Sequence, residues 1–245
     1  MRYKATCTFN GYHYFGWQIQ PQQSTIQSSI EQALRKITKS RISVVGCSRT
    51  DARVSALDFV FHFDADVKIP VESFVQAFNA NLPDDIRVHM IEEVSDDFHA
   101  RYGVLRKRYT YSIETGPFNV FEYHHTMQYN RPLDVELMQL SANYLVGTYD
   151  FTSYNATPLS VSDNQIRTID RLTVVKEGTK VKIIVESKSF LHHMVRMITQ
   201  TLIEVGAHRI AVEQVEKIRD AKDKKACRFN APAQGLCLER IWYKQ

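Results

Sequence analysis

The pattern of hydrophobic and polar positions divides the chain into short strands and amphipathic helices. From Arg2 to Phe9 apolar and polar residues alternate, which predicts an opening strand. Between residues 25 and 38 apolar side chains recur at helical spacing, and Ser24 with Gln27 fits a capping box. The first third of the chain therefore predicts a strand, a loop rich in glycine and aromatic residues, and a helix.

Asp51 lies in a short connection between two segments that have the pattern of strands. An apolar run precedes it at 42–45, and alternating residues follow it at 59–63. Such a pair of strands would hold the carboxylate at the tip of a loop. The next predicted elements are a helix that starts at Pro70 and stops before Asn81, and a strand at 87–94.

The second half of the chain repeats the alternation of strands and helices. Two mixed α+β halves follow from this pattern, with a boundary near residue 103 that gives segments 1–103 and 104–245. The predicted elements of the second half are a strand at 107–114, a helix near 134–146 closed by Gly147, a hairpin turning at 177–179, a helix at 190–205 closed by Gly206, a helix near 212–220 and a strand at 236–243.

Composition excludes several classes of protein. The chain has 245 residues, 44% of them hydrophobic, and a formal net charge of +4, which permits a nucleic-acid partner without requiring one. The four cysteines have no CxxC or zinc-ligand spacing, so we expect reduced thiols and no metal site. No apolar run reaches the length of a membrane span, and the first residues lack a signal-peptide core. We expect a soluble, cytoplasmic protein.

Asp51 is the strongest candidate for chemistry. Arg49, two residues earlier, would hold the carboxylate in its charged form, which suits nucleophilic attack better than proton donation. The alternative is an ion pair that only stabilises a turn.

A second group of residues mixes cations with aromatic rings. Phosphates could bind to the cations, and an exposed base could stack on a ring, although single tyrosines on a strand are more often part of a core. The cations of this group are Arg101, Arg106, Lys107 and Arg108, and they surround Tyr102 and Tyr109. We expect Tyr111, on the same strand as Tyr109, to be a core residue.

The adjacent His192 and His193 do not predict a metal site. Neighbouring residues on a helix point about 100° apart, and the residue four positions after His192 is Arg196, which is not a metal ligand. We expect His192 and Arg196 to share a polar helix face, which is either solvated or functional.

Eight segments occur in the order and at the spacing found in one family. With them the chain resembles the TruA-type tRNA pseudouridine synthases over nearly its whole length. The segments are FGWQIQPQQSTIQ at 15–27, SRTDARVSA at 48–56, NANLPDDI at 79–86, DDFHARY at 96–102, KRYTYSI at 107–113, YDFTSY at 149–154, SFLHHMVRMITQTLIEVG at 189–206 and APAQGLCL at 231–238.

The resemblance implies a fold, a reaction and roles for particular residues. It implies two α+β subdomains that merge mostly antiparallel sheets around a central cleft. The implied reaction is isomerisation of uridine to pseudouridine in the anticodon stem-loop of tRNA, around positions 38 to 40, by a homodimer without cofactors. Asp51 would be catalytic, Arg49 and Arg196 would support its charge, Tyr109 would stack on the uracil, and Leu236 would pack beneath it.

The chain departs from the family's pattern around Asp51. Ser48, Arg53 and Ser55 stand where the family has Gly, Gly and His, and a side chain costs about 1 kcal/mol where a glycine would adopt positive φ. These side chains could misplace Asp51, or Arg53 could add a phosphate contact and change which uridines are reached. Apart from these departures, two rival functions stay open: the chain could bind RNA without catalysis, or it could be an unrelated hydrolase or glycosidase whose second carboxylate is Asp58 or Asp64.

Overall fold

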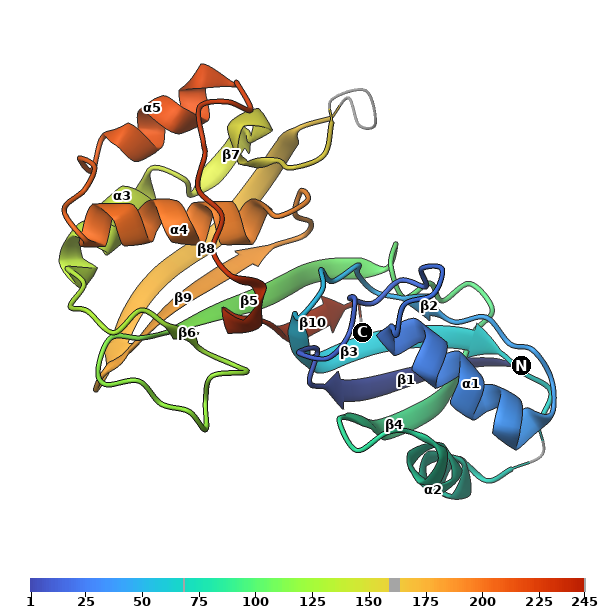
Figure 1. Cartoon of the computed structure of the whole chain (residues 1–245). Coiled ribbons are helices and arrows are strands. Elements are labelled where there is room, and N and C mark those ends of the chain that lie inside the picture. The colour runs from blue at the N-terminus through green and yellow to red at the C-terminus, as the bar shows by residue number, and fades with distance from the viewer. Residues whose placement is uncertain (68, 159–163, 245) are drawn as a thin grey trace. The chain divides into compact units, whose positions relative to one another are not determined.

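The computed structural model describes residues 1–67, 69–158 and 164–244. Helices and strands are mixed along the chain (Figure 1), and the strand pairs are mostly antiparallel. The chain forms two compact units, here called unit 1 (residues 1–105 and 237–245) and unit 2 (residues 106–236). The predicted α+β class with mostly antiparallel strands is confirmed.

Unit 1 is built on a sheet whose strands have the order β4–β1–β3–β10, with β2 on β3. The alternation predicted for the first strand is present, and every second residue from Tyr3 to Phe9 is buried. All pairings are antiparallel except that of β10 with β3. The strands are β1 (Arg2–Phe9), β2 (Val45–Gly46), β3 (Ser55–Asp64), β4 (Ile86–Val94) and β10 (Leu236–Tyr243).

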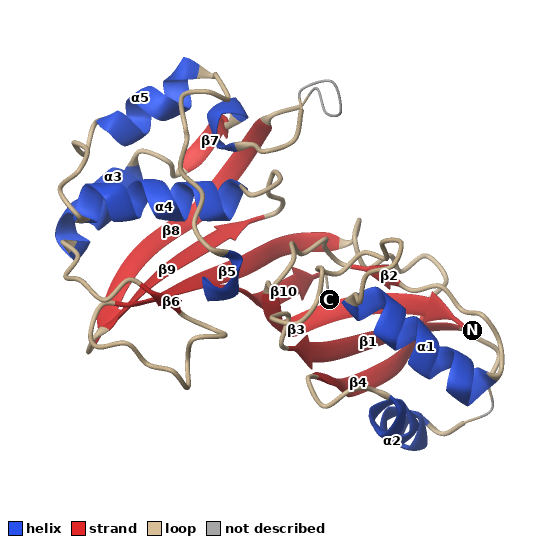
Figure 2. Cartoon of the chain, in the orientation of Figure 1, coloured by secondary structure: helices blue, strands red, loops and turns tan. Residues whose placement is uncertain are grey.

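Two helices, α1 (Ile26–Thr38) and α2 (Val71–Asn81), belong to unit 1 (Figure 2). The capping box of α1 is formed by Thr25 and Ser28, one residue later than predicted, because the side chain of Thr25 accepts from the backbone N of Ser28. Helix α2 is present where predicted, but it begins directly after Pro70, which is its N-cap residue, and it includes Asn81, where the sequence predicted that it would already have stopped.

The core of unit 1 is rich in aromatic rings. Phe61 is fully buried and packs against Phe63 and Phe78. Trp17 stacks on Phe59 with ring centroids 4.1 Å apart. This stacking packs the loop before α1 against β3. It therefore helps to position Trp17, whose backbone N donates to the carbonyl O of Thr50 in the Asp51 loop.

Unit 2 has a sheet with the order β5–β9–β8–β7, and β6 pairs with β5. The predicted hairpin turns at Gly178, which has φ +62°. The elements are β5 (Val104–Glu114), which begins in unit 1, β6 (Met127–Gln128), α3 (Val135–Asn143), β7 (Gly147–Asp150), β8 (Ile166–Glu177), β9 (Lys180–Ser187), α4 (Met194–Gly206) and α5 (Gln214–Ala221), with 3-10 turns at Thr152–Tyr154 and Ala233–Gly235.

Helix α3 is shorter than predicted. It ends at Asn143, and Gly147 begins β7 instead of closing the helix. The backbone N of Tyr144 and that of Leu145 donate to carbonyls three residues earlier, which tightens the last turn and ends the α-helical pattern.

The last strand, β10, belongs to a different unit from the one in which the division at residue 103 would place it. Residues 237–245 belong to unit 1 because β10 pairs with β3, Cys237 lying opposite Ser55 and Leu238 opposite Ala56. The two paired strands are far apart in the sequence, so no local pattern of residues predicts that β10 pairs with β3. The division into 1–103 and 104–245 remains a prediction about domains.

No helix within the described part of the chain is long and apolar enough to cross a membrane.

His62 is a buried histidine on β3. It is 5% exposed, and its Nδ1 accepts a hydrogen bond from the backbone N of Ala100 at 3.1 Å. Burial lowers the pKa of His62 to about 4; the charges of His99 and Arg2 act in the same direction, and Asp64 acts against them. His62 is therefore neutral in the folded protein at pH 7.

We expect the free energy of unfolding to fall as the pH decreases from about 6.5 to about 4. In this window the unfolded chain binds a proton at residue 62 that the folded protein does not bind, so stability rises with pH. His62→Asn keeps an acceptor and removes the titration, so it should flatten this dependence in urea titrations at several pH values. The exposed His89 supplies the control, His89→Asn. An unchanged slope in His62→Asn would contradict the assignment.

Candidate functional site

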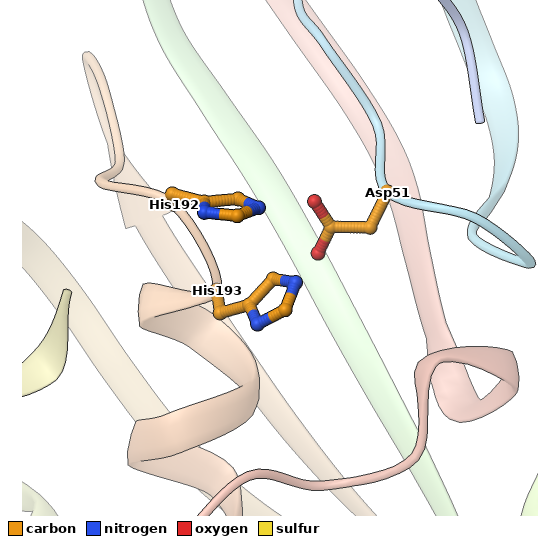
Figure 3. Close-up of side chains that lie close together, drawn as sticks. All are labelled: Asp51, His192 and His193. Carbon is orange, nitrogen blue, oxygen red and sulfur yellow. The ribbon is translucent and has the colours of Figure 1, made fainter. Parts of the chain in front are cut away.

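The loop that carries Asp51 is fastened to the loop at residues 11–17. The backbone N of Trp17 donates to the carbonyl O of Thr50 at 3.2 Å, and the backbone N of Arg53 donates to the carbonyl O of Tyr14 at 3.0 Å. Asp51 is half-buried, and its carboxylate projects from the loop (Figure 3). Backbone hydrogen bonds on both sides of the carboxylate therefore fix the loop that bears it.

Gly16 permits the close approach of these two loops. Its φ is +84°, and a Cβ at this position would lie 2.4 Å from the carbonyl O of Thr50 and 3.0 Å from the carbonyl C of Asp51. Any side chain here would have to displace the backbone of the Asp51 loop. Gly16 was not among the residues predicted from the sequence, although a glycine in a loop of aromatic residues is a signal of close backbone contact.

Arg53 has a backbone conformation that favours glycine. The backbone N of Val54 donates to the carbonyl O of Asp51 at 3.2 Å and closes a four-residue turn, in which Arg53 is third with φ +68°. This conformation costs a non-glycine residue about 1 kcal/mol. Ser48, the other residue that stands in place of a family glycine, is not in the left-handed region.

The same loop contains a second feature that lowers the stability of the fold, a buried hydroxyl without a hydrogen bond in the part of the chain that the structure describes. Thr50 is 8% exposed, and its hydroxyl has no hydrogen-bond partner among the described residues. Unsatisfied buried groups and strained backbone are uncommon and are concentrated at functional sites. Both features flank Asp51, which makes this loop the best candidate for the active site in unit 1.

Arg49 does not have the position that the sequence suggested. Its side chain is exposed, and no salt bridge joins it to Asp51 among the residues that the structure describes. Water solvates an exposed guanidinium well enough to compete with a surface ion pair. The expected Arg49–Asp51 pair is therefore absent, and Arg49 is accessible to a ligand from solvent.

The two carboxylates of the hydrolase alternative have structural contacts. Asp64 pairs with Arg2, whose Nε is 2.8 Å away, and this hydrogen bond lowers the pKa of the Asp64 carboxyl. Asp58 accepts from the backbone N of Ile241 at 3.2 Å and so links β3 to β10. Neither of these contacts involves Asp51.

Arg196 of unit 2 is held by the segment before β10. Its Nε donates to the carbonyl O of Ala231 at 2.8 Å, and the backbone N of Ala231 donates to the carbonyl O of Arg196 at 3.1 Å. Arg196 is half-buried, and its positive charge partly offsets the rise that burial causes in the pKa of Tyr111. The guanidinium is thus positioned by the backbone.

The start of α4 lies later than predicted. His193 is the N-cap residue with φ +60°, and the helix begins at Met194 rather than at 190. The rings of His192 and His193 lie 4.1 Å apart at the start of the helix (Figure 3), and Nδ1 of His193 is 3.1 Å from Nδ2 of Asn230. His192 therefore precedes the helix and does not share a helix face with Arg196.

Tyr109 and Leu236 are largely buried in unit 2. Tyr109 is 6% exposed, and Phe190 meets its ring edge to face at 5.3 Å. Leu236 is 5% exposed and begins β10. Tyr111 is fully buried, and its hydroxyl donates to the carbonyl O of Pro232 at 2.7 Å, which confirms it as a core residue.

The structure divides the predicted basic group, and two of its four cations contact the buried carboxylate of Glu186. Arg106 and Arg108 lie on the same side of β5 and contact Glu186 at 3.2 Å and 2.7 Å, and the Glu186 side chain is 5% exposed. Lys107 points to the opposite side and is 8% exposed, so it does not face solvent as a phosphate contact would. Arg101, in unit 1, is half-buried.

Comparison with known proteins gives one consistent family. A family model described as tRNA pseudouridine synthase matches residues 5–103 and 141–244. A tRNA pseudouridine synthase A of Bacillus licheniformis is 40% identical over 246 residues, which are 99% of this chain and 99% of the relative. A tRNA pseudouridine synthase A 2 of Clostridium perfringens is 38% identical over 243 residues, which are 98% of each chain. A tRNA pseudouridine synthase A of Bacillus subtilis is 38% identical over 246 residues, with 99% of each chain covered.

Proposed function

This chain belongs to the tRNA pseudouridine synthase family, and from that premise we propose that it isomerises uridine to pseudouridine in tRNA, using the carboxylate of Asp51. The observation that carries the proposal is similarity at 38 to 40% identity over almost the full length of relatives that bear this name. The strained, backbone-fastened turn at Asp51 supports the choice of the catalytic residue. We place the target uridine in the anticodon stem-loop, around tRNA positions 38 to 40.

The reaction exchanges one glycosidic bond for another. The bond from ribose C1′ to uracil N1 breaks, the base turns, a bond from C1′ to C5 forms, and the proton on C5 is replaced by one on N1. No net oxidation or hydrolysis takes place, so the balance of atoms needs no redox cofactor. Asp51 either adds to the substrate or removes a ribose proton, and both routes need a base that has left its stack.

In this proposal three residues of unit 2 recognise the target nucleotide. Tyr109 stacks on the uracil, Leu236 packs beneath it, and Arg196 supports negative charge at the reacting groups. Phe190 fixes the ring of Tyr109, and the Ala231 backbone fixes Arg196, so both side chains are oriented before substrate binds.

We propose that Arg101, Arg106 and Arg108 contact RNA phosphates. The support is that Arg106 and Arg108 place two guanidinium groups on the same side of β5, where both contact Glu186. The buried position of Lys107 gives no support for its proposed role in phosphate binding.

We further propose a cytoplasmic homodimer, in which two copies of the chain bind one tRNA. The support is the family resemblance. Size-exclusion chromatography with light scattering, with and without tRNA, tests the stoichiometry. A monomer that binds tRNA one to one at all concentrations would contradict it.

Mapping of pseudouridine on unmodified tRNA transcripts tests the function. We expect the purified protein to convert one or more uridines in the anticodon arm. Conversion elsewhere in tRNA would keep the reaction and overturn the target position. Tight binding without conversion would overturn catalysis in favour of RNA binding alone.

A further inference from the structure

Arg53 has an exposed side chain on a strained backbone in the turn that begins at Asp51. Its φ of +68° suits glycine, yet the residue carries one of the longest side chains. The hydrogen bond from its backbone N to the carbonyl O of Tyr14 keeps it in this conformation. The chain thus has an arginine two residues after the proposed catalytic residue, at a conformational cost.

Tyr12 supports the side chain of Arg53. The guanidinium carbon lies 5.4 Å from the centroid of the Tyr12 ring. The backbone N of Tyr12 donates to Oδ1 of Asn10 at 3.1 Å, which helps to fix the loop that bears the ring. The stabilisation from such an exposed contact and the cost of the left-handed backbone are of similar size and opposite sign. Arg53 therefore adds little net stability to the fold.

The charge of Arg53 is available to a ligand. Among the described residues Arg53 has no salt bridge, and its side chain is exposed. One face of the guanidinium lies toward Tyr12, while its N–H groups at the edge remain able to donate to an anion in a two-pronged arrangement. RNA offers such an anion at every nucleotide.

We propose that Arg53, supported by Tyr12, binds a backbone phosphate of the RNA next to the uridine on which Asp51 acts. Two residues of extended chain span at most about 7 Å, so the Cα atoms of Asp51 and Arg53 are close enough for a nucleotide and its neighbour to be held together. Strain retained at such a site is explained by a gain in substrate binding. This inference rests on the proposed function.

Three variants separate the charge of Arg53 from its backbone strain. Arg53→Gly removes both, Arg53→Gln removes the charge and keeps the strain, and Arg53→Lys keeps both. We expect the Gly and Gln variants to bind unmodified tRNA about tenfold more weakly, with the slope of log affinity against log salt reduced by about one. Arg53→Lys should stay within about threefold of the parent protein, since it can still contact a phosphate.

Thermal unfolding shows whether a binding defect reflects misfolding. Arg53→Gly should unfold at the same or a higher temperature than the parent protein, so weaker binding by this variant cannot come from loss of fold. Equal tRNA affinity and salt slope in all four proteins would overturn the inference. A base contact instead of a phosphate contact would weaken binding without changing the salt slope, and this result would also overturn it.

The outcome is distinguishable from failure of the proposed function. Binding is measured on proteins that carry Asp51→Asn as well as on the parent background, so turnover does not affect it. Pseudouridine formation by the parent protein with unchanged binding by the Arg53 variants overturns only the inference. Absence of pseudouridine with a parent protein that binds tRNA overturns only the catalytic function.

Discussion

Replacing Asp51 by asparagine should abolish pseudouridine formation while leaving tRNA binding within a few fold of the parent protein. Asparagine has the same shape but can neither attack ribose or uracil as a carboxylate nor remove a proton. Loss of a catalytic group of this kind lowers the rate by at least about ten-thousandfold. Single-turnover assays on an unmodified tRNA transcript, combined with filter binding, measure both quantities.

Asp97→Asn is the matched control for this change. Asp97 is an exposed residue of the same unit, and its substitution removes one negative charge as well. A gain in RNA affinity that comes only from reduced repulsion should therefore occur in both variants. If the activity of Asp51→Asn stayed within tenfold of that of the parent protein, Asp51 would not be the catalytic group. Such activity would also contradict the alternative that the chain binds RNA without catalysis.

Gly16→Ala should lower both the stability of the protein and its activity. The new Cβ would meet the carbonyl O of Thr50 at 2.4 Å, so the Asp51 loop must move. The left-handed backbone and this collision together should cost about 2 to 4 kcal/mol in the free energy of unfolding. A shift of the carboxylate by about 1 Å is enough to lower the rate about a hundredfold.

Gly178→Ala separates the cost of the left-handed backbone from the cost of the collision with the Asp51 loop. Gly178 also has positive φ, at +62°, but a Cβ there has nothing within 4 Å. We expect this variant to lose about 1 kcal/mol from the backbone alone and to keep its activity. The rate for Gly16→Ala is measured per folded molecule, well below its unfolding temperature. If Gly16→Ala retained parental activity, the contact between the two loops would not position Asp51.

Local elements followed from the sequence because their signals are local. The alternation in β1 and the helical spacing in α1 each depend on a few consecutive residues, and the structure has both elements within one residue of the predicted bounds. The shifted starts of α1 and α4 have equally local causes, since a cap is decided by one side chain or one backbone angle. His193 starts α4 late because of its positive φ.

The candidate site was only partly visible in the sequence. The position of Asp51 between two strands was predictable, and so was the burial of Tyr111. The missing salt bridge of Arg49 and the burial of Lys107 were not, because the spacing of charges gives no direction for their side chains. Strand alternation would have placed Lys107 opposite Arg106 and Arg108, but it does not say which side is covered.

The sequence by itself determined the family, the α+β class and the order of the elements, since these depend on motifs and on the periods of helices and strands. Only the tertiary structure decided which distant segments meet. In the structure β10 pairs with β3 in unit 1, and Gly16 packs against the Asp51 loop. Arg53 has a left-handed backbone, and its guanidinium lies over the ring of Tyr12. The physical reason is that pairing and packing between residues far apart in the chain depend on the whole fold, whereas periodicity is set by neighbours.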